Sequence, residues 1–222
     1  MQIEELIPFW TKLTKKEQEV LRERSMVQHV KKGTVIHNGS EDCTGLIIVE
    51  EGQLRAYTLS EEGKEITLYR MFQRDACLFA ASCIMNNIQF EVVIEAREDS
   101  KVLIIPTQIY QQLIHTSLPV ANFTNDLMAS RFSDVMWVME QILNKSVDVR
   151  LAAFLVEEME ISGESVLKMT HEEIAHHLGT AREVITRMLK YFQKEQLVHL
   201  ARGSIEIVDE NRLYELAKDS RR

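Results

Sequence analysis

The sequence predicts an α+β protein that has an N-terminal half of the barrel or jelly-roll type, then a long helix, then a helix-turn-helix followed by a hairpin. Three observations predict this class. Short strand-like segments fill residues 25–106, apolar residues recur at helical spacing from Pro119 onward, and two short helices meet at Gly179. The predicted domains are residues 1–118, 119–144 and 145–222.

The composition is that of an ordinary globular protein, with 222 residues, 45% of them hydrophobic and 27% charged. No apolar run approaches the roughly 20 residues of a membrane helix, and the start, MQIEELIPFW, lacks the basic segment of a signal peptide. The three cysteines are too few, and odd in number, for a disulfide framework. We therefore expect a protein of the reducing cytoplasm that has no membrane partner.

The net charge of −8 at first argues against a nucleic-acid partner. The charge is unevenly distributed, however, because residues 168–203 carry six basic and four acidic side chains, a local charge of +2. This weak basic segment coincides with the predicted helix-turn-helix.

The N-terminal half opens with a short helix, since Thr14 and Glu17 have the spacing of a capping box. Strand-like segments follow at residues 35–37, 45–59, 65–72, 90–96 and 101–106. Glycines separate them, and the SEEGK segment around Gly63 is typical of a hairpin. Strands at this spacing predict a compact barrel or jelly roll.

The long helix carries a narrow apolar seam in which steps of four and three residues alternate. The seam consists of Met128, Phe132, Val135, Met139 and Ile142. A core helix lying on the barrel and a dimer seam explain this pattern equally well. After a break at residues 144–146 a second helix is expected, and a third begins after Thr170.

Two predicted capping boxes, ten residues apart, start the helices of the helix-turn-helix: Thr170 with Glu173, and Thr180 with Glu183. Between them, Ala175 allows two helices to cross closely, and Gly179 suits the left-handed conformation that ends a helix. The second helix has an apolar stripe made of Val184, Ile185, Met188, Leu189 and Phe192. The segment LVHLARGSIEIV then predicts a wing-like hairpin that turns at Arg202-Gly203.

A helix-turn-helix places the first residues of its second helix against base edges in the major groove of DNA. The predicted base-reading residues are Arg182, Glu183, Thr186 and Arg187, and the predicted backbone contacts are Thr170, Thr180, Lys190 and Arg202. Arginine can donate two hydrogen bonds to guanine, and glutamate can accept one from cytosine N4. The alternatives are that Glu183 serves only its capping box and that the arginines are ordinary solvated charges.

The segment HEEIAH superficially matches the zinc-protease motif, which needs two histidines four residues apart. Here His171 and His176 are five apart, about 140° around a helix, so a zinc hydrolase is disfavoured and no catalytic residue is predicted. Two rivals to a DNA-binding protein remain. One is a metal-dependent enzyme built on the histidines of residues 171–177, and the other is a protein-interaction module with an acidic β domain.

This order of parts resembles the cyclic-AMP receptor protein/FNR (Crp/Fnr) family of bacterial transcription regulators over almost the full chain. The most specific match is RExxxR at residues 182–187, and VEEGQLRAY at 49–57 is similar to a family hairpin. The resemblance implies a double-stranded β roll of the cyclic-nucleotide-binding type, a dimer interface on the long helix, and a homodimer on palindromic DNA. It also implies RNA polymerase as a partner and a TGTGA-like half-site, although Thr186 leaves TTGAT open.

The resemblance breaks down at the effector site. Leu78-Phe79 and Phe90-Glu91 stand where cyclic-nucleotide members carry Gly-Glu and Arg-Ser, which argues against cyclic AMP. An FNR-type iron-sulfur cluster needs four cysteines, most of them near the N-terminus, whereas this chain has three and none before Cys43. A non-nucleotide signal is therefore expected.

The predicted effector pocket is apolar and consists of Cys77, Leu78, Phe79, Cys83 and Phe90, with Ile84 and Met85 nearby. Haem is a candidate ligand because Cys77, Cys83 or His37 could bind its iron. The alternatives, that the two cysteines are small buried hydrophobic residues or a thiol switch, remain open.

Overall fold

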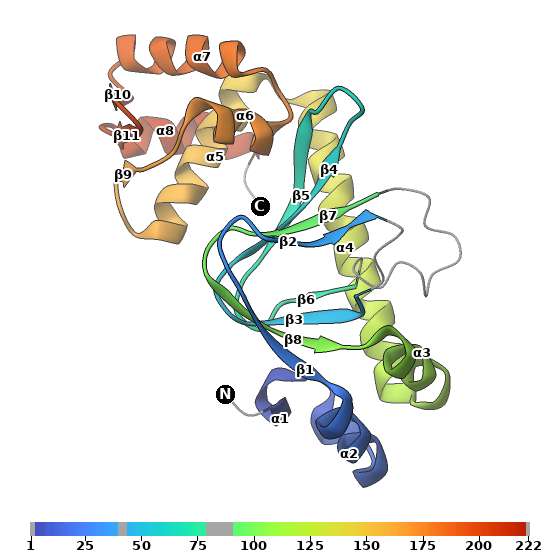
Figure 1. Cartoon of the computed structure of the whole chain (residues 1–222). Helices are drawn as coiled ribbons and strands as arrows, with labels where there is room; N and C mark the ends of the chain where they lie inside the picture. The colour runs from blue at the N-terminus through green and yellow to red at the C-terminus, as the bar shows by residue number, and fades with distance from the viewer. Residues whose placement is uncertain (1–2, 40–43, 79–90, 221–222) are drawn as a thin grey trace. The chain divides into compact units, whose positions relative to one another are not determined.

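The structure is a computed structural model that describes residues 3–39, 44–78 and 91–220 of the chain (Figure 1). The chain forms two compact units, one made of residues 1–59 and 68–135 and the other of residues 60–67 and 136–222. The predicted boundaries at residues 118 and 144 are the limits of one long helix, α4 (Leu118–Asn144), which contributes to both units. The predicted α+β class is confirmed.

The first unit is a β roll made of two four-stranded sheets, with strand orders β1-β8-β3-β6 and β2-β7-β4-β5. Its strands are β1 (Met26–Val30), β2 (Val35–Asn38), β3 (Leu46–Glu51), β4 (Leu54–Leu59), β5 (Glu65–Met71), β6 (Ala76–Cys77), β7 (Val93–Ala96) and β8 (Ser100–Ile105). Its helices are α1 (Ile3–Leu6), η1 (Trp10–Lys12), α2 (Lys15–Arg24), α3 (Thr107–Thr116) and the first part of α4.

Strand β3 explains the continuous apolar runs in the sequence. In a strand with one exposed face, apolar and polar residues would alternate instead. Successive side chains of a strand point to opposite faces of its sheet. Leu46 and Ile48 pack with the helices of this unit, whereas Ile47 and Val49 pack in the interior of the roll. The neighbouring strand β8 divides its residues between the same two clusters, so both faces of this sheet are buried.

Helix α2 begins as predicted, because Thr14 accepts a hydrogen bond from the Glu17 N–H and Glu17 accepts one from the Thr14 N–H. Helix α3 was not anticipated, since its N-cap is Pro106 without a side-chain hydrogen bond and it buries only Tyr110 and Leu113. Strand β1 was missed for a similar reason: four of its five residues are exposed, so no apolar pattern marks it.

A buried arginine attaches the first part of α4 to the roll. Arg131 donates one hydrogen bond to Asp134 at 2.9 Å and another to the Ala76 carbonyl at 3.0 Å, and its guanidinium lies 4.3 Å from the centre of the Tyr69 ring. The charge is thus paired and hydrogen-bonded, as a buried charge requires. Burial also raises the pKa of Tyr69 well above its usual value.

The second unit contains, besides residues 60–67 and the end of α4, a three-stranded sheet of order β10-β11-β9 and a set of short helices. The elements are α5 (Val147–Ser162), β9 (Val166–Leu167), α6 (His171–Leu178), α7 (Arg182–Lys194), β10 (Val198–Ala201), β11 (Ser204–Ile207), α8 (Glu210–Ala217) and η4 (Lys218–Ser220). The β10–β11 hairpin turns at Arg202-Gly203, so the predicted wing is confirmed (Figure 1).

One apolar core holds the second unit together, and its fully buried residues come from α5, α6, α7 and α8. They include Leu151, Leu155, Ile174, Ile185, Leu189, Phe192 and Leu213. In the part of the chain that the structure describes, no helix is long and apolar enough to cross a membrane.

Candidate nucleic-acid interface

Helix α6, the first of the helix-turn-helix, begins with the predicted capping box. The Glu173 N–H donates to Thr170 Oγ1 at 3.1 Å, and the Thr170 N–H donates to a Glu173 carboxylate oxygen at 2.8 Å. Two otherwise unpaired backbone donors are satisfied in this way, which fixes His171 as the first helical residue.

The helix ends at Gly179, which adopts the left-handed conformation (φ +62°, ψ +39°) that was predicted for the turn. The backbone N–H groups of both Gly179 and Thr180 donate to the carbonyl of Ala175. Glycine tolerates this conformation because it has no Cβ atom.

Helix α7, the second of the helix-turn-helix, begins one residue later than the sequence predicted. Its N-cap is Ala181, which makes no side-chain capping hydrogen bond, so the predicted capping box of Thr180 and Glu183 is wrong. The physical reason is that the Thr180 N–H still closes the last turn of α6. Glu183 therefore has no capping role, which removes the structural alternative for this carboxylate.

One face of α7 is apolar and the other is polar, as predicted. Ile185, Leu189 and Phe192 are completely buried in the core of the unit. The opposite face forms a surface depression of about 480 Å³ that is lined by Arg182, Glu183, Thr186, Arg187 and Lys190. The structure thus brings together all four predicted base-reading residues and one predicted backbone contact.

The other three predicted backbone contacts do not line this depression. Thr170 is exposed at the start of α6, Thr180 is half-buried in the turn, and Arg202 is exposed at the tip of the wing. Their contacts with DNA remain predictions.

The cations of the depression are available to a ligand. Arg187 makes no ion pair with any residue that the structure describes, and Arg182 has one loose neighbour, Glu172, at 3.8 Å. Both members of that pair are largely exposed, and exposed ion pairs contribute little to stability. An incoming anionic group can therefore displace Glu172 at small cost.

His171 contacts the polar face of α7, which the sequence does not reveal because there the histidine suggests only a metal motif. Its Nδ1 atom lies 2.9 Å from Thr186 Oγ1, and the Thr186 hydroxyl donates to the Arg182 carbonyl, also at 2.9 Å. Burial, together with the charges of Arg182 and Lys190, lowers the pKa of His171 from its usual value of 6.5.

We expect this lowered pKa to make the stability of the second unit depend on pH. Well above pH 6.5 His171 is neutral in both the folded and the unfolded chain, so it adds no pH dependence there. As the pH falls below that value, the unfolded chain takes up the proton first, and stability decreases until the folded pKa is passed. Thermal unfolding of the wild type and His171→Asn from about pH 8 to about pH 5 tests this: the wild type should lose stability toward acid relative to the variant, which has no titrating ring at this position. Parallel curves would contradict the assignment.

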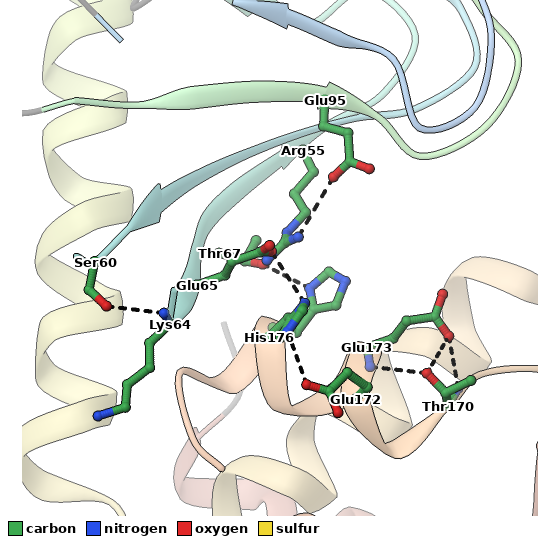
Figure 2. A network of polar contacts seen from close by, with 11 residues as sticks. Arg55, Ser60, Lys64, Glu65, Thr67, Glu95, Thr170, Glu172, Glu173 and His176 are labelled. Carbon is green, nitrogen blue, oxygen red and sulfur yellow. Dashed lines mark hydrogen bonds and ion pairs between the residues drawn. The ribbon is translucent and has the colours of Figure 1, made fainter. Parts of the chain in front are cut away.

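The tip of the β4–β5 hairpin, residues 60–67, packs on α6 within the second unit. Figure 2 shows His176 between two carboxylates, with Nδ1 3.5 Å from Glu65 and Nε2 3.3 Å from Glu172. His177 Nδ1 lies 2.9 Å from the Thr67 hydroxyl.

The histidines on which the metal-enzyme rival depends thus have separate partners: Thr186 for His171, Glu65 and Glu172 for His176, and Thr67 for His177. Among the described residues, no group of three or more potential metal ligands is placed to hold an ion. The geometry gives these histidines contacts within the protein instead.

We expect Gly179→Ala to destabilise the second unit by more than the usual cost of a left-handed alanine. That conformation alone costs about 1–2 kcal/mol for a residue with a Cβ atom. In addition, a Cβ atom at this position would lie 2.5 Å from Cγ1 of Ile66 on the hairpin tip. Denaturant unfolding measures the total loss.

Gly163→Ala is the matched control, because Gly163 also ends a helix at positive φ (+69°) but has open space around it. The difference between the two variants reports the contact with Ile66. In the background of Ile66→Ala, the two glycine substitutions should cost the same, because the contact that distinguishes them is absent. Equal losses at both glycines would show that the hairpin tip does not press on this turn.

The effector residues are only partly described. Cys77 is fully buried in the roll interior with its Sγ atom 3.7 Å from the Tyr69 hydroxyl, whereas Leu78 is buried in the cluster shared with the helices. Phe79, Cys83, Ile84, Met85 and Phe90 lie outside the described residues. The effector pocket thus remains a prediction.

Most residues of the predicted α4 seam are exposed to solvent. Phe132 is 68% exposed, Met139 and Ile142 are also exposed, and Val135 is half-buried. Met128 packs partly against the core of the roll. Exposed apolar residues that gather along one element mark an interaction surface more often than isolated ones do.

Comparison with known proteins identifies the family. The family description of a cyclic nucleotide-binding domain matches residues 27–117, and that of a Crp-like helix-turn-helix domain matches residues 149–216. A crystal structure from Eubacterium rectale, of a protein assigned to the crp/fnr family of transcriptional regulators, is 57% identical with a TM-score of 0.95. The match covers 96% of this chain and 99% of that one. This chain belongs to the Crp/Fnr family.

Other Crp/Fnr proteins are more distant. Electron transport regulator A of Shewanella oneidensis is 28% identical over 202 residues, which cover 86% of this chain and 78% of that protein. The fumarate and nitrate reduction regulatory protein of Vibrio cholerae is 28% identical over 199 residues, which cover 85% and 77%. The protein is thus a DNA-binding transcription regulator of the Crp/Fnr type, and the predicted family and fold are confirmed.

Proposed function

We propose that this Crp/Fnr regulator acts as a homodimer that reads a palindromic DNA site through α7 and responds to a signal other than a cyclic nucleotide. The main observation in favour of DNA reading is the polar depression on the first turns of α7. The opposite face of this helix holds it in the core through three completely buried residues. Arg187 can donate two hydrogen bonds to guanine, and Glu183 can accept one from a cytosine amino group. Lys190, further along the helix, suits a phosphate.

The exposed apolar seam of α4 supports the homodimer. A two-fold axis along this helix would bury Phe132, Met139 and Ile142 against their copies. Met136 and Leu143, which the sequence pattern did not single out, are exposed on the same helix and would enlarge the contact. The two α7 helices of a dimer would then read half-sites about one DNA turn, or roughly 34 Å, apart.

Residues of the β roll support the proposal that the effector is not a cyclic nucleotide. Leu78, which stands where cyclic-nucleotide members carry part of their ligand-binding pair, is buried in an apolar cluster. The burial of Cys77 in the roll interior, with its sulfur 3.7 Å from the Tyr69 hydroxyl, supports its role as a core residue over that of a haem ligand. RNA polymerase as a partner and the cytoplasm as location follow, as proposals, from membership of the family.

Selection from a duplex library with a randomised core, followed by fluorescence anisotropy on the enriched duplexes, tests this function. We expect a palindrome, an affinity that falls steeply with salt, and no change when cyclic AMP is added. Enrichment of no sequence would contradict DNA reading by this protein. A cyclic-AMP-dependent affinity would overturn the proposed signal only.

A further inference from the structure

We propose that His171 is a positioning residue for DNA recognition: it holds the Thr186 hydroxyl inside the protein, so that Thr186 offers its methyl group to a thymine. This inference rests on the proposed DNA reading by α7. It assigns a role to a residue of the first helix that lines no part of the polar depression.

The hydrogen bonds of Thr186 determine what this side chain can offer. A hydroxyl has one proton to donate and two lone pairs that accept. The proton goes to the Arg182 carbonyl one turn earlier in α7 at 2.9 Å, and one lone pair faces His171 Nδ1 at 2.9 Å. With the hydroxyl proton used in this way, Nδ1 carries a proton and acts as the donor. Thr186 therefore has no donor left for DNA.

What remains of Thr186 is one lone pair and the γ-methyl group. Thr186 lines the depression together with Arg182, Glu183 and Arg187, so this methyl group belongs to the predicted reading face. Thymine presents its own C5 methyl group in the major groove, and an apolar contact with a threonine methyl is one way in which it is recognised. The geometry thus favours a thymine at the base pair that Thr186 meets.

Without His171, the Thr186 hydroxyl would no longer be held in one orientation. Threonine in a helix divides between two χ1 rotamers, one of which bonds back to the preceding turn. The bond from His171 stabilises the back-bonded rotamer from outside the helix. Two charged groups of α7, Arg182 and Lys190, act on the His171 ring, and Arg182 in turn lies 3.8 Å from Glu172 of α6. Burial, and then the charges of these two cations, lower the pKa of the His171 ring from its usual value.

The test replaces each thymine of the selected half-site, in turn, by deoxyuridine, which removes one methyl group and changes nothing else. For the wild type we expect about fourfold weaker binding at one position of each half-site, the value of one buried methyl group. The thymine-to-uracil affinity ratio is the readout because it cancels any general loss of affinity.

Three variants separate positioning from a merely structural role. His171→Ala should bring the ratio close to one, whereas His171→Asn should restore it, because the asparagine amide can donate from the place of Nδ1. Thr186→Val keeps the methyl group but loses the hydroxyl. It should keep the ratio, and adding His171→Ala to it should change nothing.

The outcomes distinguish this inference from the proposed function. A wild type that enriches no sequence contradicts DNA reading itself. A wild type that selects a palindrome but shows no uracil effect at any thymine overturns the inference alone. So does a His171→Ala variant that keeps the full ratio. If His171→Ala does not fold, Thr186→Val tests the inference. A thymine-to-uracil affinity ratio close to one in this variant would show that the hydroxyl, not the methyl group, reads the base, and would overturn the inference.

Discussion

Phe132→Asp is expected to turn the protein into a monomer and to weaken its binding to a palindromic duplex by about a hundred- to ten-thousandfold. Phe132 is 68% exposed on α4, and in a two-fold dimer it lies near its own copy. The substitution removes an aromatic contact and places two carboxylates in one buried interface, where unpaired charges are strongly unfavourable. Binding at one half-site then no longer raises the effective concentration of a second α7 at the other half-site. Sedimentation measures the mass, and fluorescence anisotropy measures the affinity.

Ser130→Asp is the matched control, since Ser130 is exposed on the same helix about 160° away from the centre of the seam. It adds the same charge and should leave both mass and affinity unchanged. A Phe132→Asp variant that stays dimeric and binds the palindrome normally would place the dimer interface elsewhere. Binding of the monomer to a single half-site would show that α7 remains folded.

The sequence predicts well those parts of the fold in which a local pattern and the tertiary structure agree. The helix-turn-helix is one of them, because the capping box at Thr170, the left-handed Gly179 and the buried stripe of α7 all act within a few residues. Strands β3 and β8 are another. Their apolar runs reflect burial on both faces of the sheet.

Local patterns failed where two geometries compete for the same residues. The spacing of Thr180 and Glu183 is that of a capping box, but the Thr180 N–H is already used by the turn that follows Gly179. The helix therefore starts at Arg182 with an alanine N-cap. This shift leaves the Glu183 carboxylate without a capping role, as the proposed base contact requires.

Contacts between distant residues could not be predicted from spacing at all. The bond between His171 and Thr186 joins two helices, and the bond between Thr67 and His177 joins a hairpin to α6 across 110 residues. In the sequence these histidines suggest only an imperfect metal motif. Their positions in the folded chain give them hydrogen-bond partners within the protein instead.

Arg187→Ala is expected to lower the affinity for the selected palindrome by about 1–3 kcal/mol per half-site and to relax the base preference at one position. Arg187 has no ion pair among the described residues, and it lines the depression at the reading face of α7. Its loss should therefore remove the proposed base contact without disturbing the fold. Anisotropy with the palindrome and with four duplexes that vary the base at this position measures both effects.

Lys190→Ala is the control that separates base reading from attraction to phosphates. Lys190 lies one turn further along α7 in the same depression, so its loss should weaken binding to all sequences equally. It should also lower the slope of log affinity against log salt by about one unit per half-site. Equal losses for Arg187→Ala on the palindrome and on scrambled DNA would contradict base reading, because a guanine contact cannot contribute where no guanine is presented. Since the two side chains carry the same charge on one helix face, only their different reach to the bases can produce the predicted contrast.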